Sequence, residues 1–332
     1  MTVSTTFNAY RVFEENGKVS SRLTKLSLDD LTPGNVVIKA AYSSVNYKDA
    51  LAGTGAGRIM RRFPLVGGID VAGTIESSAD PRWTPGKSVL VTGYDLGVSQ
   101  DGGYAEYVRV PSEWVVEIPA GLTPFDAMTI GTAGFTAALS IVEMEHNGLK
   151  KESGPVIVTG ATGGVGSLAV EILASLGYKI TALTGKDDQH DFLRSIGAAE
   201  VLSRATLQMG TKPLEKSLWA GAVDPVGGEI LSWLTRTMNY GGTIASSGLT
   251  GGTELKTTVL PFILRGVKLL GIDSALCPMP RRLDVWRRLA TDMKPRRLKE
   301  LAHEVGLSDL PDVFSALLAG KATGRSVVRV GL

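Results

Sequence analysis

A glycine-rich segment is the part of this sequence with the clearest chemical meaning. The apolar run Val156–Thr159 passes directly into Gly160–Gly166, and an apolar segment typical of a helix follows. Glycines let a backbone turn tightly and approach a pyrophosphate, whose charge then lies at the helix N-terminus. The spacing fits a dinucleotide fingerprint, Ala161-x-Gly163-x-x-Gly166, with alanine at the first glycine position. This strand–turn–helix context favours a dinucleotide site over a glycine-rich loop in another kind of α/β domain.

The end of the next predicted strand indicates which dinucleotide binds. NAD-binding folds place an acidic residue there, about 20 residues beyond the turn, where it binds the ribose 2′-hydroxyl. Here Thr184, Gly185 and Lys186 occupy that place. A hydroxyl and a cation favour a 2′-phosphate, so we predict NADPH as the cofactor. The next two residues, Asp187 and Asp188, are acidic, which is an argument for NAD. We expect them instead to begin the next helix, where acidic side chains complement the helix dipole.

Two regions of different character must position this turn. Short apolar or alternating runs bounded by glycine or proline dominate residues 1–123, which predicts a compact β-rich barrel or sandwich. Beyond them, apolar strands alternate with helical segments, which predicts βαβ units and a parallel sheet. We therefore expect an α/β fold, with a Rossmann-type doubly wound parallel sheet in residues 124–276. The β-rich substrate domain would comprise residues 1–123 and 277–332.

The individual elements follow from apolar patterning and from the turn residues that bound them. The predicted strands are Val36–Tyr42, Ser88–Thr92, Tyr104–Val110, Val156–Thr159, Lys179–Thr184, Gly221–Asp224, Gly242–Ala245, Val267–Ile272 and Ser326–Val330. The predicted helices are Ser167–Leu176, Glu229–Met238, Arg281–Leu301 and Leu310–Ala319.

Composition argues against several classes of protein. A net charge of +2 gives no indication of a nucleic-acid or membrane partner. Met1–Tyr10 lacks the pattern of a secretory signal, and the uncharged stretch Ala127–Val142 is shorter than the ~20 residues that span a bilayer. The single cysteine, Cys277, excludes an intramolecular disulfide, and three widely spaced histidines argue against a standard zinc site. We predict a metal-free cytoplasmic protein.

Further motifs resemble the medium-chain dehydrogenase/reductase superfamily along essentially the whole chain. The motifs that carry the resemblance are Ser43–Asp49, Gly67–Gly73, Gly102–Val108 and Gly131–Ala137. The resemblance implies that the β-rich domain is a GroES-like barrel. Zinc-dependent members carry Cys, His and Cys ligands at positions that match Asn46, Ile69 and Ala133, and the structural zinc lobe is absent here. The chain therefore resembles the zinc-free, quinone-oxidoreductase-like branch.

Within that branch the chain is most similar to the acrylyl-CoA reductases, on the segments Asn46–Leu51, Asn239–Gly242 and Thr257–Arg265. Those enzymes use NADPH to reduce the conjugated double bond of acrylyl-CoA to propanoyl-CoA. The resemblance implies cofactor contacts at a set of positions in both halves of the chain. They are Tyr47, Thr162, Gly163, Gly164, Val165, Thr184, Gly185, Lys186, Arg204, Leu249, Ile263 and Ser274. Arg204 would be a second cation for the 2′-phosphate.

Reduction of an enoyl thioester without a metal makes three demands on the protein. Hydride must reach the β-carbon from close range, the thioester oxygen needs preorganised donors, and the α-carbon needs a proton. Asn46 and Tyr47 lie in the loop of the lost metal site, so an amide and a phenol are the candidate catalytic donors. Tyr94 is a further candidate acid. The alternative for Tyr47 is a structural hydrogen bond, and we expect Asp70 to fasten the neighbouring loop.

Coenzyme A carries a 3′-phosphate and a pyrophosphate, so cations are expected near its site. Arg61 and Arg62 follow a glycine-rich loop of the β-rich half, and Arg325 precedes the final strand. We predict that these three arginines bind the substrate. The many basic residues of Arg281–Leu301 are better explained as a solvated helix face.

Together these features predict an NADPH-dependent reductase of the C=C bond of a short enoyl-CoA, with acrylyl-CoA as substrate. We expect a homodimer that pairs the edge strand Val267–Ile272. One alternative is an NADPH quinone or 2-alkenal reductase, whose smaller apolar pocket would leave the arginines solvated. The other is a non-catalytic NADPH-binding sensor that has kept the fold.

Overall fold

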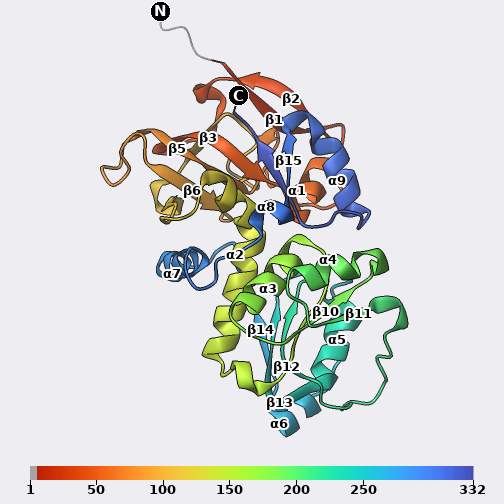
Figure 1. The fold of residues 1–332 in the computed structure, drawn as a ribbon. Coiled ribbons are helices and arrows are strands. Elements are labelled where there is room, and N and C mark those ends of the chain that lie inside the picture. Colours follow the sequence, from red (N-terminus) through yellow and green to blue (C-terminus); the bar gives the residue numbers. More distant parts are fainter. Residues whose placement is uncertain (1–5, 332) are drawn as a thin grey trace, which may run out of the picture. The chain divides into compact units, whose positions relative to one another are not determined.

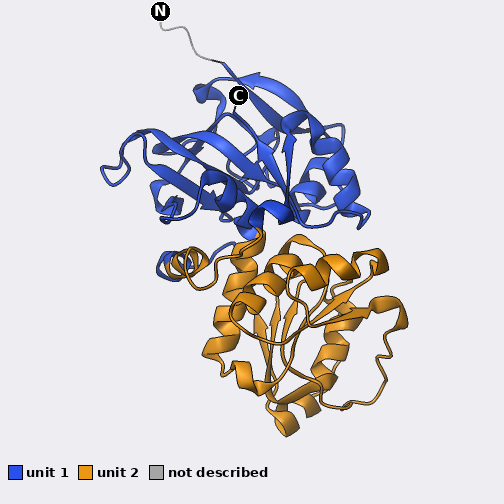
Figure 2. Cartoon of the chain, viewed as in Figure 1, with its two compact units in different colours: residues 1–132, 275–283, 298–332 blue, residues 133–274, 284–297 orange. Residues whose placement is uncertain are grey.

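The computed structural model describes residues 6–331 and divides the chain into two compact units (Figure 2). Unit 1 contains residues 1–132, 275–283 and 298–332, and unit 2 contains residues 133–274 and 284–297. Each unit is built from segments that are distant in sequence, so the last part of the chain contributes to both.

Unit 1 is built from two sheets (Figure 1). Its elements are β1 (Phe7–Glu15), β2 (Lys18–Leu26), β3 (Val36–Ser44), α1 (Tyr47–Thr54), β4 (Leu65–Val66), β5 (Asp70–Ser78), β6 (Ser88–Thr92), β7 (Tyr107–Val110), β8 (Val116–Glu117), α8 (Leu298–Leu301), β15 (Ala302–Gly306), α9 (Leu310–Leu318) and β16 (Arg325–Arg329). The smaller sheet has the order β2-β1-β4, and the larger has the order β15-β16-β3-β5-β6-β8 with β7 also paired to β3. The β-rich architecture predicted for this half is confirmed.

Antiparallel pairing of β16 with β3 determines which residues meet in unit 1. Val327 of β16 lies opposite Ser44 at the end of β3. Arg325, at the start of β16, therefore lies beside the segment that runs from β3 into α1. Both strands are mostly buried, because their apolar side chains join a core that also contains Phe314 of α9.

Unit 2 is the Rossmann-type doubly wound sheet that the sequence predicts. Its six strands are all parallel, in the order β11-β10-β9-β12-β13-β14. The strands are β9 (Val156–Val158), β10 (Ile180–Thr184), β11 (Glu200–Ser203), β12 (Trp219–Asp224), β13 (Met238–Ser246) and β14 (Lys268–Gly271). From β9 the chain adds β10 and β11 on one side of the sheet, and then β12, β13 and β14 on the other. Ligands bind such sheets at the carboxyl ends of the strands, near the point where the strand order reverses.

Helices complete the layers of unit 2 (Figure 1). They are α3 (Gly164–Ser175), α4 (His190–Ser195), α5 (Gly228–Thr237) and α6 (Leu260–Arg265), with most of α2 (Pro124–His146) and of α7 (Met279–Leu289). Helix α5 buries Ile230, Leu231 and Leu234 in a core with Ile157 and Ile244 of the sheet. Apolar side chains of α5 thus cover part of the sheet.

The structure corrects several details of the sequence-based assignment. The first unit boundary follows Thr132 rather than residue 123. Residues 284–297 belong to unit 2, where Arg288 pairs with Glu145 of α2 at 2.8 Å and Trp286 stacks on Phe135. The expected helix Arg281–Leu301 is consequently two helices, α7 and α8, separated by a turn that contains a proline.

The expected strand Tyr104–Val110 is shorter than predicted. Only its second half forms β7 beside β3. Tyr104 instead exchanges backbone hydrogen bonds with Tyr10 and Gly67, and Glu106 donates its N–H to Asn8. This part of the chain joins the two sheets of unit 1 rather than extending β7.

Helix α2 is long and apolar enough to cross a membrane by length and composition. It contains a kink at Gly131, and 78% of its most apolar window is buried within the protein. Burial of this extent is typical of a core helix. It is the one helix of this kind among residues 6–331.

Candidate functional site

The glycine-rich turn joins β9 to α3 at the carboxyl edge of the parallel sheet. Gly160 has a φ of +53°, and a Cβ atom on Gly166 would lie 2.3 Å from the Gly160 carbonyl oxygen. Only glycine permits this close approach of two backbone segments. Gly163 is the N-cap of α3 and has no side chain with which to cap it. The N–H groups of the first helical turn are therefore suited to bind an anion.

A buried carboxylate, which the sequence analysis missed, lies beside this turn and connects two strands of the sheet. Thr159, after β9, donates its hydroxyl to Asp224 Oδ1 at 2.5 Å, and Asp224 ends the neighbouring strand β12. The Asp224 carboxylate also accepts from the N–H groups of Val226 and Gly227. Burial raises the pKa of Asp224, and these hydrogen bonds partly offset that rise. The contact ties the two strands together where the sheet changes direction.

Two cations lie together beyond the ends of β10 and β11. Arg204 follows β11, and its Nη2 atom would lie 2.9 Å from a Cβ on Gly185. Lys186 is the residue after Gly185 and is half-buried, and this burial lowers its pKa despite the nearby Asp188. Glycine at position 185 gives the Arg204 guanidinium room beside the backbone. The two predicted 2′-phosphate ligands are thus brought to one place on unit 2.

The remaining predicted cofactor residues of unit 2 divide into two groups. Leu249 and Ser274 follow β13 and β14, so they lie at the same carboxyl edge as Thr162–Val165. Ile263 does not: it lies in α6, which leads into the amino end of β14. Arg265 of the same helix donates to the carbonyls of Arg236, near the end of α5, and of Met238, the first residue of β13. The parallel sheet places Ile263 at the end opposite the glycine-rich turn, and the structure does not support its assignment as a cofactor contact.

In unit 1, Asn46 is the N-cap of α1 and holds a buried polar cluster together. Its amide nitrogen donates to Asp70 Oδ2 at 2.8 Å and to Asp49 Oδ2 at 3.2 Å. Its amide oxygen accepts from Arg325 at 3.3 Å. Both amide hydrogens are committed within the protein, so Asn46 has no donor for a substrate oxygen. Its predicted role as a catalytic donor is corrected to one of positioning α1.

Asp70 fastens the kink of α2 to the end of β3. Its carboxylate accepts from the Ser44 hydroxyl at 2.6 Å, and from the N–H and hydroxyl of Thr132 at 2.9 and 2.5 Å. Gly131 has a φ of +49°, and a Cβ atom there would lie 2.7 Å from both Asp70 Oδ2 and Ser44 Oγ. The glycine therefore lets the backbone approach and present Thr132. This geometry agrees with the expectation that Asp70 fastens a loop.

Arg325 is the cation at the centre of the same cluster. It is 3% exposed. Its guanidinium donates to the carbonyls of Thr129 and Val45 at 3.0 and 2.9 Å, and to Ser44 Oγ at 2.9 Å, as well as to Asn46. Because this guanidinium is buried and hydrogen-bonded within the protein, it is not accessible to a ligand from solution. The prediction that Arg325 binds substrate phosphate is not supported, because its charge offsets the buried carboxylates instead.

Burial and like charge shape the electrostatics of this cluster. Desolvation, and next the neighbouring Asp70, raise the pKa of Asp49 to about 7, although the N–H groups of Asn46 and Ile69 donate to its carboxylate. Burial, followed by the two carboxylates, raises the pKa of the Tyr104 hydroxyl well above its ordinary value. Desolvation lowers the pKa of Arg325, and the two carboxylates oppose that change. The cluster therefore holds one cation against two acidic groups, one of which titrates near neutrality.

The positions that match zinc ligands do not form a zinc site. The Asn46 amide is committed to hydrogen bonds, Ile69 is aliphatic, and Ala133 carries only a methyl group. Arg325 already supplies positive charge to the two carboxylates, so a zinc ion does not fit among them. Within residues 6–331 no three His, Cys, Asp or Glu side chains are grouped closely enough to hold a metal ion.

The two tyrosines predicted to donate protons both lie in unit 1. Tyr47 is the first residue of α1 and is half-buried, and its hydroxyl has no hydrogen-bond partner among the described residues. Tyr94 has a φ of +52°, stacks on Trp114 with ring centroids 5.2 Å apart, and lies 4.4 Å from the guanidinium carbon of Arg282. Arg282 is fully buried and donates to Thr92 and Ala275. Arg282 is one of the basic residues expected on a solvated helix face. It is instead buried and packs against the Tyr94 ring.

Arg61 and Arg62 are exposed on unit 1, as a role in binding an anion requires. Arg61 lies 3.5 Å from the Asp95 carboxylate, and both side chains are well exposed. An exposed pair of this kind contributes little stability. The prediction that these two residues bind substrate stays a prediction.

Two family models match the chain. One describes an alcohol dehydrogenase GroES-like domain and matches residues 32–120, within unit 1. The other describes a zinc-binding dehydrogenase and matches residues 164–287, most of which lie in unit 2.

Two named relatives match along nearly their whole length. The chain is 49% identical over 330 residues to YhfP of Bacillus subtilis, which is named as a quinone oxidoreductase, with 99% of this chain and 100% of that protein covered. It is 46% identical over 318 residues to the acrylyl-CoA reductase AcuI of Ruegeria pomeroyi, with 96% of each covered.

Solved structures show the same fold with nicotinamide dinucleotides. The YhdH oxidoreductase of Salmonella enterica in complex with NADP superposes with a TM-score of 0.95 at 44% identity, covering 98% of this chain and 100% of that one. YhfP with NAD bound superposes with a TM-score of 0.95 at 49% identity, with the same coverage.

Proposed function

This chain belongs to the medium-chain dehydrogenase/reductase superfamily, and on that premise we propose that it is an NADPH-dependent reductase of the C=C bond of a short enoyl-CoA. Acrylyl-CoA is the proposed substrate and propanoyl-CoA the product. The resemblance to an acrylyl-CoA reductase at 46% identity supports the thioester. NADPH supplies the hydride for the β-carbon when it is bound.

The observation that carries the proposal is the pair of cations beside the glycine-rich turn. NADP and NAD have both been seen in relatives of 44% and 49% identity. Lys186 and Arg204, next to the backbone of Gly185, favour the cofactor with a 2′-phosphate. The loop from β10 supplies no acidic side chain for a ribose 2′-hydroxyl before Asp187.

Unit 1 would supply the proton and the donors for the thioester oxygen. Tyr47 is the proposed catalytic donor, because its hydroxyl is uncommitted among the described residues and α1 fixes its backbone. Tyr94 is the proposed second acid, held by Trp114 and Arg282. The roles of Asn46, Asp70 and Arg325 are to hold α1 in place.

We also propose that the enzyme is a cytoplasmic homodimer. Strand β14 ends the sheet of unit 2 and presents an unpaired edge. Val259, Ile263 and Leu264 beside it are between 54% and 68% exposed. Sedimentation at micromolar concentration should give twice the mass of the chain, and a monomer would contradict this arrangement.

The central test is NADPH oxidation by the purified protein without added metal, with acrylyl-CoA and a benzoquinone in parallel and NADH as the cofactor control. Saturable turnover of acrylyl-CoA at micromolar concentration is the expected result. Turnover of the quinone alone would replace the proposal with the quinone reductase that the YhfP resemblance suggests. Binding of NADPH without turnover of either substrate would favour a sensor.

A further inference from the structure

Unit 1 contains a surface pocket of about 860 Å³ beside the carboxyl end of α1. This volume lies within the ~300–1,000 Å³ typical of small-molecule sites. Its lining residues come from β1, β2, α1, the loop that follows α1 and the loop that follows β6. Among them are Glu14, Lys48, Arg58, Met60, Arg61 and Phe63.

Glycine in the left-handed conformation shapes this pocket. Gly55 ends α1 with a φ of +73°, and a Cβ atom on it would lie 2.7 Å from the Cβ of Val19. The chain therefore turns back closely over β2, and the loop that follows contributes Arg58 and Arg61 to the pocket. The floor is apolar, because Ala52 and Met60 belong to a small buried cluster that Phe63 packs against.

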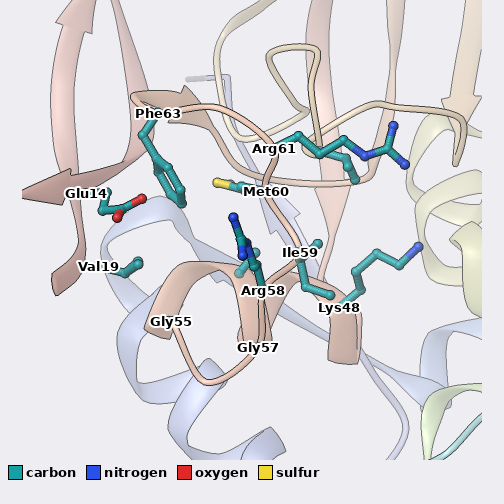
Figure 3. A pocket seen from close by; sticks show the side chains of 12 residues that line it. Glu14, Val19, Lys48, Gly55, Gly57, Arg58, Ile59, Met60, Arg61 and Phe63 are labelled. Atoms are coloured by element: carbon teal, nitrogen blue, oxygen red, sulfur yellow. The ribbon is translucent and has the colours of Figure 1, made fainter. Parts of the chain in front are cut away.

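The charged side chains of the pocket are divided between its two ends (Figure 3). In Figure 3, the ring of Phe63, the Arg58 side chain and the Glu14 carboxylate point into the same end, over the sulfur of Met60. Lys48 and Arg61 extend toward the other side. Lys48, Arg58 and Glu14 have no ion-pair partner among the described residues. Arg61 has only the exposed pair with Asp95 at 3.5 Å.

We propose that this pocket binds the 3′-phospho-ADP part of coenzyme A, an inference that rests on the proposed function. The adenine lies against Phe63, and Glu14 accepts a hydrogen bond from its amino group. Arg58 binds the 3′-phosphate, and Lys48 with Arg61 binds the pyrophosphate. Three cations against one acid complement the strongly negative nucleotide.

The placement of Lys48 also links this pocket to the proposed chemistry. Lys48 follows Tyr47 directly, in the first turn of α1. A nucleotide held at Lys48 therefore directs its pantetheine arm along the amino end of α1. The site explains how one short helix carries both the catalytic donor and part of the substrate anchor.

Binding of a nucleotide fragment tests the pocket without requiring turnover. Adenosine 3′,5′-bisphosphate should bind the wild-type protein in calorimetry, and Arg58→Ala should weaken it roughly tenfold. Arg82→Ala is the matched control, since Arg82 is an exposed arginine of the same unit that pairs with Asp80 and does not line the pocket. Adenosine 2′,5′-bisphosphate, the corresponding part of NADPH, should respond to Lys186→Ala and not to Arg58→Ala.

Kinetics provide a second readout. In Arg58→Ala the ratio of kcat/KM for acrylyl-CoA to that for acrylyl-pantetheine should fall roughly tenfold, through KM. An unchanged ratio in an enzyme that reduces acrylyl-CoA would overturn the pocket and leave the proposed function standing. Loss of adenosine 3′,5′-bisphosphate binding in Arg58→Ala, without turnover of acrylyl-CoA by the wild type, would support the pocket and overturn the proposed reaction.

Discussion

Two arginines of this protein, one in each unit, lie beside glycine-containing turns but have opposite environments. Arg204 of unit 2 lies against Gly185 on an exposed edge. Arg325 of unit 1 is buried, close to where Gly131 lets Asp70 and Ser44 approach the backbone. The Arg204 guanidinium is available to a ligand, whereas the Arg325 guanidinium donates its hydrogen bonds to groups within the protein. Under the proposed function, the same residue type therefore recognises the cofactor in one unit and stabilises the fold in the other.

Removal of the buried cation should have the largest effect. Arg325→Met leaves Asp49 and Asp70 without their positive neighbour, so the free energy of unfolding should fall by about 3–5 kcal/mol. Urea unfolding of the variant measures this directly. Arg329→Met removes an exposed arginine of the same strand, paired with Glu304, and should cost less than about 1 kcal/mol. Equal losses in the two variants would contradict the view of Arg325 as a structural cation.

The pH dependence of stability should reveal the second acid of the cluster. The pKa of Asp49 is raised to about 7 from its ordinary value of 3.8, so the folded state binds a proton that the unfolded state releases. The bound proton stabilises the folded state. This contribution to the free energy of unfolding is complete below about pH 4 and is lost as pH rises through about 7, an effect on the order of 4 kcal/mol. Asp49→Asn, which stays neutral, should show a flatter dependence of unfolding free energy between pH 4 and 8.

A carboxylate on the surface of unit 1 provides the control for this pH prediction. Asp312→Asn removes an exposed acid from α9 and should keep the slope of the wild type. If Asp49→Asn kept that slope as well, Asp49 would not be the titrating group.

A substitution at Gly131, which contacts the cluster, should cause a smaller loss in the free energy of unfolding. Gly131→Ala adds a Cβ atom 2.7 Å from Asp70 Oδ2 at a φ of +49°, which should cost roughly 2–3 kcal/mol. Gly86→Ala also has a positive φ, +87°, but its Cβ would meet nothing within 4 Å, so it should cost about 1 kcal/mol. Thermal unfolding of both variants separates backbone strain from the clash, and equal shifts in Tm would remove the argument for a close approach.

The sequence was informative where a function depends on local backbone geometry. A strand, a glycine turn and a helix are adjacent in the chain, so the binding turn and the parallel sheet of unit 2 could be predicted. The unit 1 cluster depends on Arg325 meeting Ser44 and Asn46, which are about 280 residues away in sequence. The hydrophobic periodicity of a sequence does not indicate contacts between such distant residues. An isolated arginine before a strand has the sequence pattern of a surface cation. A usable signal was present in Asp49 and Asp70, two carboxylates in apolar surroundings that require a buried partner.

The two cations beside Gly185 should give the smallest effect per residue and the most selective one. Lys186→Ala or Arg204→Ala should each weaken NADPH binding roughly tenfold, because each variant loses one charge-assisted contact to the 2′-phosphate. NADH lacks that phosphate and should lose less than threefold, as judged by fluorescence titration of both cofactors. Arg194→Ala, an exposed arginine of unit 2 that pairs with Asp191, is the control. Equal losses for NADPH and NADH would remove the 2′-phosphate site, whereas a large loss of stability would mean that Arg204, like Arg325, is committed to the fold.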